Sequence, residues 1–239
     1  LDSTSLSHYS ACESRVVLTD TVSYTNLQAG GSYTVSGYLY DKTSGTDALD
    51  ANGSRITASA SFKAASGGSG TVTVKYSFKA DPEALAGKTY TAFETISKGS
   101  GSGSTPVIVH NDPDDTSQQV YFPGITTVLT DSSSGEHLVN AAKSVTVTDT
   151  VSYVNLEPGA VYTLKGSLYD AATGSKAVDD NGSYISAETT FTASSSGSGT
   201  ASVTYSFDAE TLGGAVLTAY ADVILDGRTV SFERDSEET

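Results

Sequence analysis

Asp20–Leu27 reads DTVSYTNL and Asp149–Leu156 reads DTVSYVNL, so one stretch of the chain is written twice, 129 positions apart. The same spacing carries further residues onto identical ones: Gly37 onto Gly166, Asp41 onto Asp170, Phe62 onto Phe191 and Phe78 onto Phe207. A repeat of this length is a whole domain and not one unit of a solenoid. The sequence therefore predicts two tandem copies of one domain, 1–123 and 124–239, an arrangement that serves reach, display or mechanics more often than catalysis.

The composition excludes several classes of partner. The formal net charge is −15 and the isoelectric point is about 4.3, which argues against nucleic acid and against an anionic membrane surface. No apolar run approaches the roughly 18 residues of a membrane span, and no signal peptide is visible. Cys12 is the single cysteine, so no intrachain disulfide is expected. Because the sequence begins at Leu1, it reads as an excised fragment of a longer protein.

Alternation of apolar and polar residues with a period of two dominates the sequence and predicts strands. The predicted strands span residues 32–40, 55–62, 71–78, 89–94, 106–109, 119–122 and 125–130. Clusters rich in Gly, Ser and Asn separate these strands, and residues 80–87 predict one short turn of helix. Short strands with turns every 8 to 15 residues predict an all-β fold of two immunoglobulin-like β-sandwiches.

One stretch, 109–120, carries residues suited to chemistry. Taken alone, an Asp-rich turn with one His is most often a solvated loop. A Ca²⁺ loop built from Asp112, Asp114 and Asp115 is a second interpretation, although the spacing of an EF-hand is missing. A hydrolase would use His110 with an Asp as base and orienting group, but no nucleophile signature such as G-x-S-x-G accompanies them. No metal or cofactor is predicted.

A family resemblance favours a fourth interpretation. The duplicated block, Tyr33–Gly37 (YTVSG), Leu39–Lys42 (LYDK) and Thr91–Glu94 (TAFE) resemble the VaFE repeat of Gram-positive surface proteins. Residues 110–118 resemble the H-x-D-x-x-D-x-x-Q motif of the ester-bond domains in bacterial adhesin stalks. The resemblance covers both halves of the chain nearly end to end.

The resemblance implies a self-crosslinking reaction. In that family a Thr hydroxyl on the first strand attacks the carboxamide of a Gln on the last strand, which releases ammonia and leaves an ester. Carried onto this sequence, Gln118 is the acceptor, His110 is the base and Asp115 orients it. Glu94 is expected to be buried and protonated beside the amide, where it donates a hydrogen bond to the developing oxyanion.

The nucleophile departs from the family pattern in the first domain. The family's attacking Thr belongs to a Thr-Thr pair near the start of the domain, which Thr126 and Thr127 supply in the second domain, with Thr126 as the better match. The same position in the first domain falls before Leu1. Thr4 is the nearest candidate there, but it matches the loop at 131–135 and is not favoured. An ordinary strand threonine remains the alternative for Thr126.

The second domain departs in the other direction. Ala221 stands where Glu94 does, and Phe232 aligns with His110. The sequence ends at Thr239, one position before the expected Gln, so this domain is either degenerate or misaligned in its tail and cut short. For the first domain three interpretations follow: a first strand that is not seen, a split domain awaiting a Thr-bearing strand from another chain, or a different natural start.

The predicted function is a structural stalk module of a cell-wall-anchored, extracellular adhesin, crosslinked by a single-turnover reaction and therefore not an enzyme. Its expected partners are neighbouring stalk domains of the same protein, with a Thr-bearing strand from another chain as an addition. The rivals are a module that binds a host ligand through its loops and a hydrolase built on His110 and Asp115. Turns made of Gly, Ser, Asn and Asp favour spacing over ligand binding.

Overall fold

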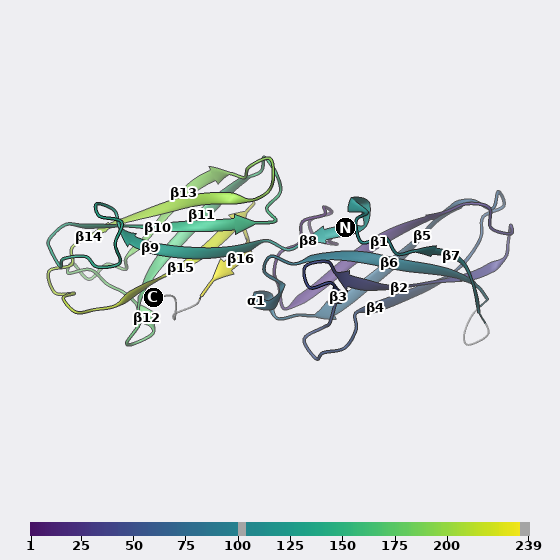
Figure 1. The fold of residues 1–239 in the computed structure, drawn as a ribbon, viewed down its shortest axis with the longest axis horizontal. Helices are drawn as coiled ribbons and strands as arrows, with labels where there is room; N and C mark the ends of the chain where they lie inside the picture. Colours follow the sequence, from purple (N-terminus) through teal and green to yellow (C-terminus); the bar gives the residue numbers. More distant parts are fainter. Residues whose placement is uncertain (100–103, 235–239) are drawn as a thin grey trace. The chain divides into compact units, whose positions relative to one another are not determined.

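The computed structural model describes residues 1–99 and 104–234, and the chain divides into two compact units, 1–122 and 123–239. Each unit is an all-β, immunoglobulin-like sandwich of two sheets (Figure 1). Within the described residues, no helix has the length and apolar character needed to cross a membrane.

The first unit packs a small sheet against a large one. The small sheet pairs β1 (Arg15–Tyr24) with β5 (Gly70–Lys79). The large sheet has the order β3-β2-β6-β7, with β4 beside β2 and β8 beside β6. Its strands are β2 (Ser32–Asp41), β3 (Thr46–Asp47), β4 (Thr57–Lys63), β6 (Thr89–Lys98), β7 (Thr105–His110) and β8 (Gln119–Tyr121). Helix α1 (Pro82–Leu85) is the predicted short turn, capped by Asp81, and a 3₁₀ turn, η2 (Thr116–Gln118), precedes β8.

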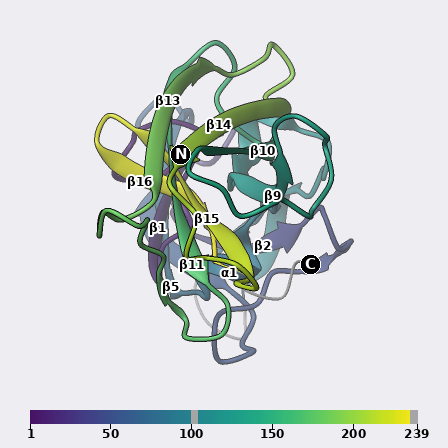
Figure 2. The same cartoon turned by 90° about the vertical axis from the view of Figure 1, so that its left-hand side faces the viewer.

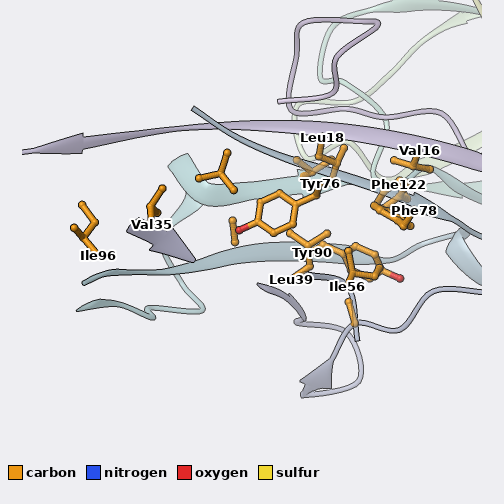
Figure 3. Packing of buried hydrophobic residues seen from close by; sticks show 14 of the residues in the cluster. Val16, Leu18, Val35, Leu39, Ile56, Tyr76, Phe78, Tyr90, Ile96 and Phe122 are labelled. Carbon is orange, nitrogen blue, oxygen red and sulfur yellow. The ribbon is translucent and has the colours of Figure 1, made fainter. Parts of the chain in front are cut away.

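Alternation along the strands explains the core. In β2 every second side chain is buried, from Tyr33 and Val35 to Leu39, because successive side chains of a strand point to opposite faces. The inner faces of both sheets meet in one cluster that contains Val16, Leu18, Val35, Leu39, Tyr76, Tyr90 and Phe122. Figure 3 shows the ring of Tyr76 in this cluster, between Leu18 and Tyr90.

The second unit repeats the arrangement. One sheet has the order β14-β10-β9, and the other has β12-β11-β15-β16 with β13 beside β11. Figure 2 views this unit end-on, with β9 and β10 on the right, β16 on the left and β15 between them. The strands are β9 (Gly124–Asp131), β10 (Val145–Val154), β11 (Val161–Asp170), β12 (Ser175–Lys176), β13 (Ser186–Thr192), β14 (Gly199–Phe207), β15 (Leu217–Leu225) and β16 (Arg228–Glu233).

The two units differ in how β1 and its counterpart β10 are paired. In the second unit β9 pairs with β10 along its whole length, with Asp131 opposite Val147. In the first unit the corresponding bridge joins Asp2 to Leu18, and Leu1 exchanges two backbone hydrogen bonds with Thr19. Leu1 and Asp2 therefore occupy the last two positions of the strand that β9 forms in the second unit. In the described chain, the rest of this edge of β1 carries no strand.

The segment after Asp2 completes the last strand of the first unit. Tyr9 bridges Tyr121 of β8, the amide of Tyr121 donates to the carbonyl of His8, and Ser10 and Cys12 are buried. The matching segment of the second unit, 132–144, is exposed throughout. Residues 8–10 therefore pack on β8, whereas the matching segment of the second unit lies in solvent.

Candidate functional site

Glu94 lies at the centre of the large sheet and inside the first unit. Its side chain is 4% exposed, and its backbone is opposite Gly37 of β2. The Tyr76 hydroxyl donates to Glu94 Oε1 at 2.9 Å. Gly37 makes this contact possible, because a Cβ at that position would lie 2.0 Å from the Tyr76 hydroxyl. The expected burial of Glu94 is therefore present, with Tyr76 as a hydrogen-bond donor to it.

A second carboxyl group completes this buried cluster. The Glu94 carboxyl is hydrogen-bonded to Asp20 of β1. Burial, followed by the bond to Asp20 and its charge, raises the pKa of Glu94 from an ordinary 4.5 to about 9. Two carboxyl groups in contact share one proton, since both cannot ionise at this separation. At neutral pH, Glu94 is therefore the protonated member of the pair, and Asp20 is the acceptor.

The Gln118 amide meets the other side of Asp20. With its nitrogen turned toward Asp20, the Gln118 amide donates to both carboxylate oxygens, at 3.1 and 3.2 Å. Gln118 and Asp20 line one cavity together with Leu1, Tyr76 and Ser117. Glu94 thus reaches the amide through Asp20, whereas the sequence pattern predicted that Glu94 lies directly beside it.

The neighbouring Gln119 is committed to structure. Its side chain is 2% exposed, its Nε2 donates to the Pro113 carbonyl at 2.9 Å and its Oε1 accepts from Tyr121 at 2.7 Å. Of the two adjacent glutamines, Gln118 is the one whose carboxamide faces the acidic pair. The one-residue difference follows from the backbone of η2, which ends at Gln118 and passes into β8.

His110 stands beside this site at the end of β7. It lies opposite Glu94 in the antiparallel register, so both side chains are on the same face of the sheet. His110 Nε2 is 3.1 Å from Asp115 Oδ2. Asp115 caps η2 by accepting from the Ser117 hydroxyl and amide, and these bonds, followed by His110, lower the pKa of Asp115. The pair is a charged carboxylate and an imidazole next to the turn that carries Gln118.

The other carboxylates of this turn are engaged locally. Asp112 accepts from the amide of Asp114 at 2.9 Å, and Asp114 forms an ion pair with Lys42 at 2.9 Å. Because Asp115 points toward His110 instead, the three carboxylates do not converge on one point as the ligands of a Ca²⁺ loop must.

The second unit indicates where a nucleophile would stand. In β9, Thr127 is 7% exposed and opposite Val151, whereas Thr126 is exposed and opposite Ser152. Thr126 was expected to be the better match to the attacking threonine, but Thr127 occupies the inward position instead. Alternate side chains of a strand face opposite sides, and only Thr127 faces the interior. Val151 and Asp149 lie two residues apart on the same face of β10, so Thr127 is a diagonal neighbour of the counterpart of Asp20.

Thr4 of the first unit is not at an equivalent place. It is exposed, in a turn where its amide donates to Asp2 Oδ1 at 2.9 Å. The position that corresponds to Thr127 lies opposite Val22, on the unpaired edge of β1, and precedes Leu1.

The second unit carries only part of the cluster. Asp149 and Tyr205 repeat Asp20 and Tyr76, and Gly166 lies opposite Ala221 as Gly37 lies opposite Glu94. Glu233, not Phe232, is opposite Ala221 as His110 is opposite Glu94. The predicted alignment of Phe232 with His110 is therefore wrong by one residue. Residues 235–239, including the predicted approach to a Gln after Thr239, lie outside the described residues.

Sequence reasoning missed Asp20 and Tyr76. Both lie within the repeated sequence, and both recur in the second domain as Asp149 and Tyr205. An Asp and a Tyr preserved at inward positions of two strands were the available signal. Neither belongs to the local H-x-D-x-x-D-x-x-Q pattern, so no spacing rule connects them to Gln118.

The first unit thus contains a carboxamide that contacts a hydrogen-bonded carboxyl pair, with a His–Asp pair next to the turn that carries the carboxamide. The family described as a T-Q ester bond containing domain matches residues 2–122 and again residues 123–239. The chain therefore belongs to the T-Q ester bond domain family and consists of two such domains. Among curated proteins, none matches the sequence.

Solved structures with similar architecture include a bacterial adhesin from Mobiluncus mulieris that contains intramolecular disulfide, isopeptide and ester bond cross-links. It aligns with 92% of this chain and 77% of its own length at 15% identity, with a TM-score of 0.41. A glycosyl hydrolase family 2 member from Bacteroides cellulosilyticus aligns with 96% of this chain and 28% of its own length, at 9% identity and a TM-score of 0.35. The family assignment rests on the sequence match to both halves.

Proposed function

We propose that the first domain forms an ester between Gln118 and a threonine on a strand that pairs with the open edge of β1. One observation carries the proposal: the Gln118 amide contacts Asp20, which is hydrogen-bonded to protonated Glu94. Gln118 and Asp20 line a cavity that Leu1 also borders. A strand continuing from Leu1 along β1, in the register of β9, would bring its inward threonine opposite Val22.

The chemistry of this step balances without a cofactor. The threonine Oγ forms a bond to Gln118 Cδ, and the Cδ–Nε2 bond breaks. His110, held by Asp115, takes the hydroxyl proton and returns it to the leaving nitrogen, which departs as ammonia. Asp20 holds the Gln118 nitrogen, which is the leaving group, by a hydrogen bond, and Glu94 is hydrogen-bonded to Asp20 in turn. The reaction occurs once per domain, so the domain does not turn over.

The product suits a stalk module of a cell-surface adhesin that is anchored to the cell wall. The ester joins the first and last strands of the sandwich, so tension on the termini loads a covalent link. A crosslink that closes a loop of about 120 residues stabilises the folded chain by roughly 5 kcal/mol in the chain-entropy estimate. With Cys12 as the single cysteine, the ester would take the place of disulfides. The strand that bears this threonine can belong to the same protein or to another chain.

An extended chain tests the proposal. Residues 124–129 (GITTVL) are placed directly before Leu1, which continues the strand in the register of β9. We expect the intact mass to fall one ammonia below the sequence value. Replacing the second threonine of the extension with valine should abolish the loss, and replacing the first should not. The proposal would be refuted if the extended chain with both threonines kept the mass of its sequence although hydrogen exchange showed that the added strand is paired.

A further inference from the structure

The Tyr76 hydroxyl is buried in the site, and a neighbouring residue leaves the space that it occupies. Tyr76 comes from β5, is 1% exposed, and crosses from the small sheet to the large one to reach Glu94. Space for its hydroxyl exists because β2 has Gly37 where any side chain would collide with it. A glycine inside a strand costs about 0.5–1 kcal/mol relative to alanine, so this contact is maintained against a local preference.

We infer that Tyr76 is a positioning residue of the ester-forming site: its hydroxyl holds one Glu94 oxygen, so that the proton on the other oxygen is directed to Asp20, which also accepts from the Gln118 amide nitrogen. The inference rests on the proposed function. The groups that face the Glu94 carboxyl are Asp20 from β1, Tyr76 from β5 and His110 from β7. Since Tyr76 donates to Oε1, that oxygen is an acceptor and the shared proton belongs on Oε2.

The second domain supplies an internal comparison. It keeps the same pair, Tyr205 and Gly166, with a Cβ at Gly166 calculated to lie 1.9 Å from the Tyr205 hydroxyl. Ala221 replaces the carboxyl group, and among the described residues the buried Tyr205 hydroxyl makes no hydrogen bond. A buried hydroxyl without a partner is destabilising, so packing alone would favour phenylalanine at this position. In the first domain the same hydroxyl donates to Glu94, which stands opposite the glycine.

Tyr76→Phe in the extended chain is the decisive variant, and Tyr205→Phe in the same chain is its matched control. Ester formation is followed by intact mass after dilution from urea, between pH 5 and pH 9. In parallel, ¹³C NMR follows the Glu94 carboxyl in the chain without the extension. We expect Tyr76→Phe to slow ester formation at least about tenfold, as loss of a buried hydrogen bond to a reacting carboxyl does. We also expect the Glu94 titration to move to higher pH, while Tyr205→Phe changes neither.

The two readouts separate failure of the inference from failure of the proposed function. If the parent extension forms the ester and Tyr76→Phe forms it within twofold of the same rate, the inference is overturned and the proposed function stands. If the parent extension forms no ester, the proposed function fails. The Glu94 titration then decides: an unshifted titration in Tyr76→Phe overturns the positioning role, and a shifted one supports it.

Discussion

Replacing Glu94 with glutamine should make the first domain more stable at neutral pH. The pKa of Glu94 is raised from 4.5 to about 9 in the folded domain, so the folded state retains a proton that the unfolded chain releases. Stability therefore falls as pH rises from about 4.5 to about 9, by up to about 1.4 kcal/mol per pH unit for this group. At pH 7 the accumulated loss is on the order of 3 kcal/mol. Glutamine does not titrate, and its amide can still accept from Tyr76 and donate to Asp20.

Pulse proteolysis in urea, with fragments identified by mass, measures the free energy of unfolding of each domain in the same sample. From pH 5 to pH 8.5, the free energy of unfolding of the first domain should rise in the Glu94→Gln variant relative to the parent by about 1.4 kcal/mol per pH unit. The second domain, which has Ala221 at this place, should be identical in both proteins and is the internal control. A difference between the two proteins that does not vary with pH would show that Glu94 is not the protonated group.

Three further predictions follow from the packing and the site. Gly37→Ala should destabilise the first domain by about 1–3 kcal/mol, because its Cβ would displace the Tyr76 hydroxyl, and Gly166→Ala should do the same to the second; equal urea midpoints in parent and variant would contradict this. The buried Cys12 thiol, whose pKa burial raises from 9.0 to about 12, should react with iodoacetamide at pH 8 about a thousandfold more slowly than in urea, unless segment 8–12 detaches from β8. In the extended chain, His110→Ala should slow ester formation at least about a hundredfold and leave the free energy of unfolding within about 0.5 kcal/mol. The chain without this substitution should show no turnover of aryl ester substrates, and turnover would favour a hydrolase.

The sequence alone predicted two all-β domains and many of their strands, although β1 was not among the predicted strands. The duplicated block and the alternation in β2, β5 and β9 depend on neighbours along the chain, so the period of two predicted their strands. The short turn at α1 was likewise predicted, and in the structure it begins at Pro82 after the capping residue Asp81. His110, Asp115 and Gln118 lie within nine residues of each other, which is why one linear motif could gather them.

The register between strands could not be predicted from the sequence. Between β15 and β16 the chain turns at Asp226 and Gly227, both with positive φ, whereas β6 and β7 are joined by a longer connection. Residue counting across connections of unequal length misaligned Phe232 with His110. Pairing with β15 decides that Glu233 takes this place.

The reactive environment is also a product of tertiary structure. Asp20 and Tyr76 come from β1 and β5 of one sheet and meet Glu94 from the opposite sheet only when the two layers pack. The same packing decides that Thr127 and not Thr126 faces inward in β9. The local pattern determines which residues form strands, because successive side chains of a strand point to opposite faces in any surroundings. Which side chains become an acid pair, and which stay in water, depends on burial between layers that are distant in sequence.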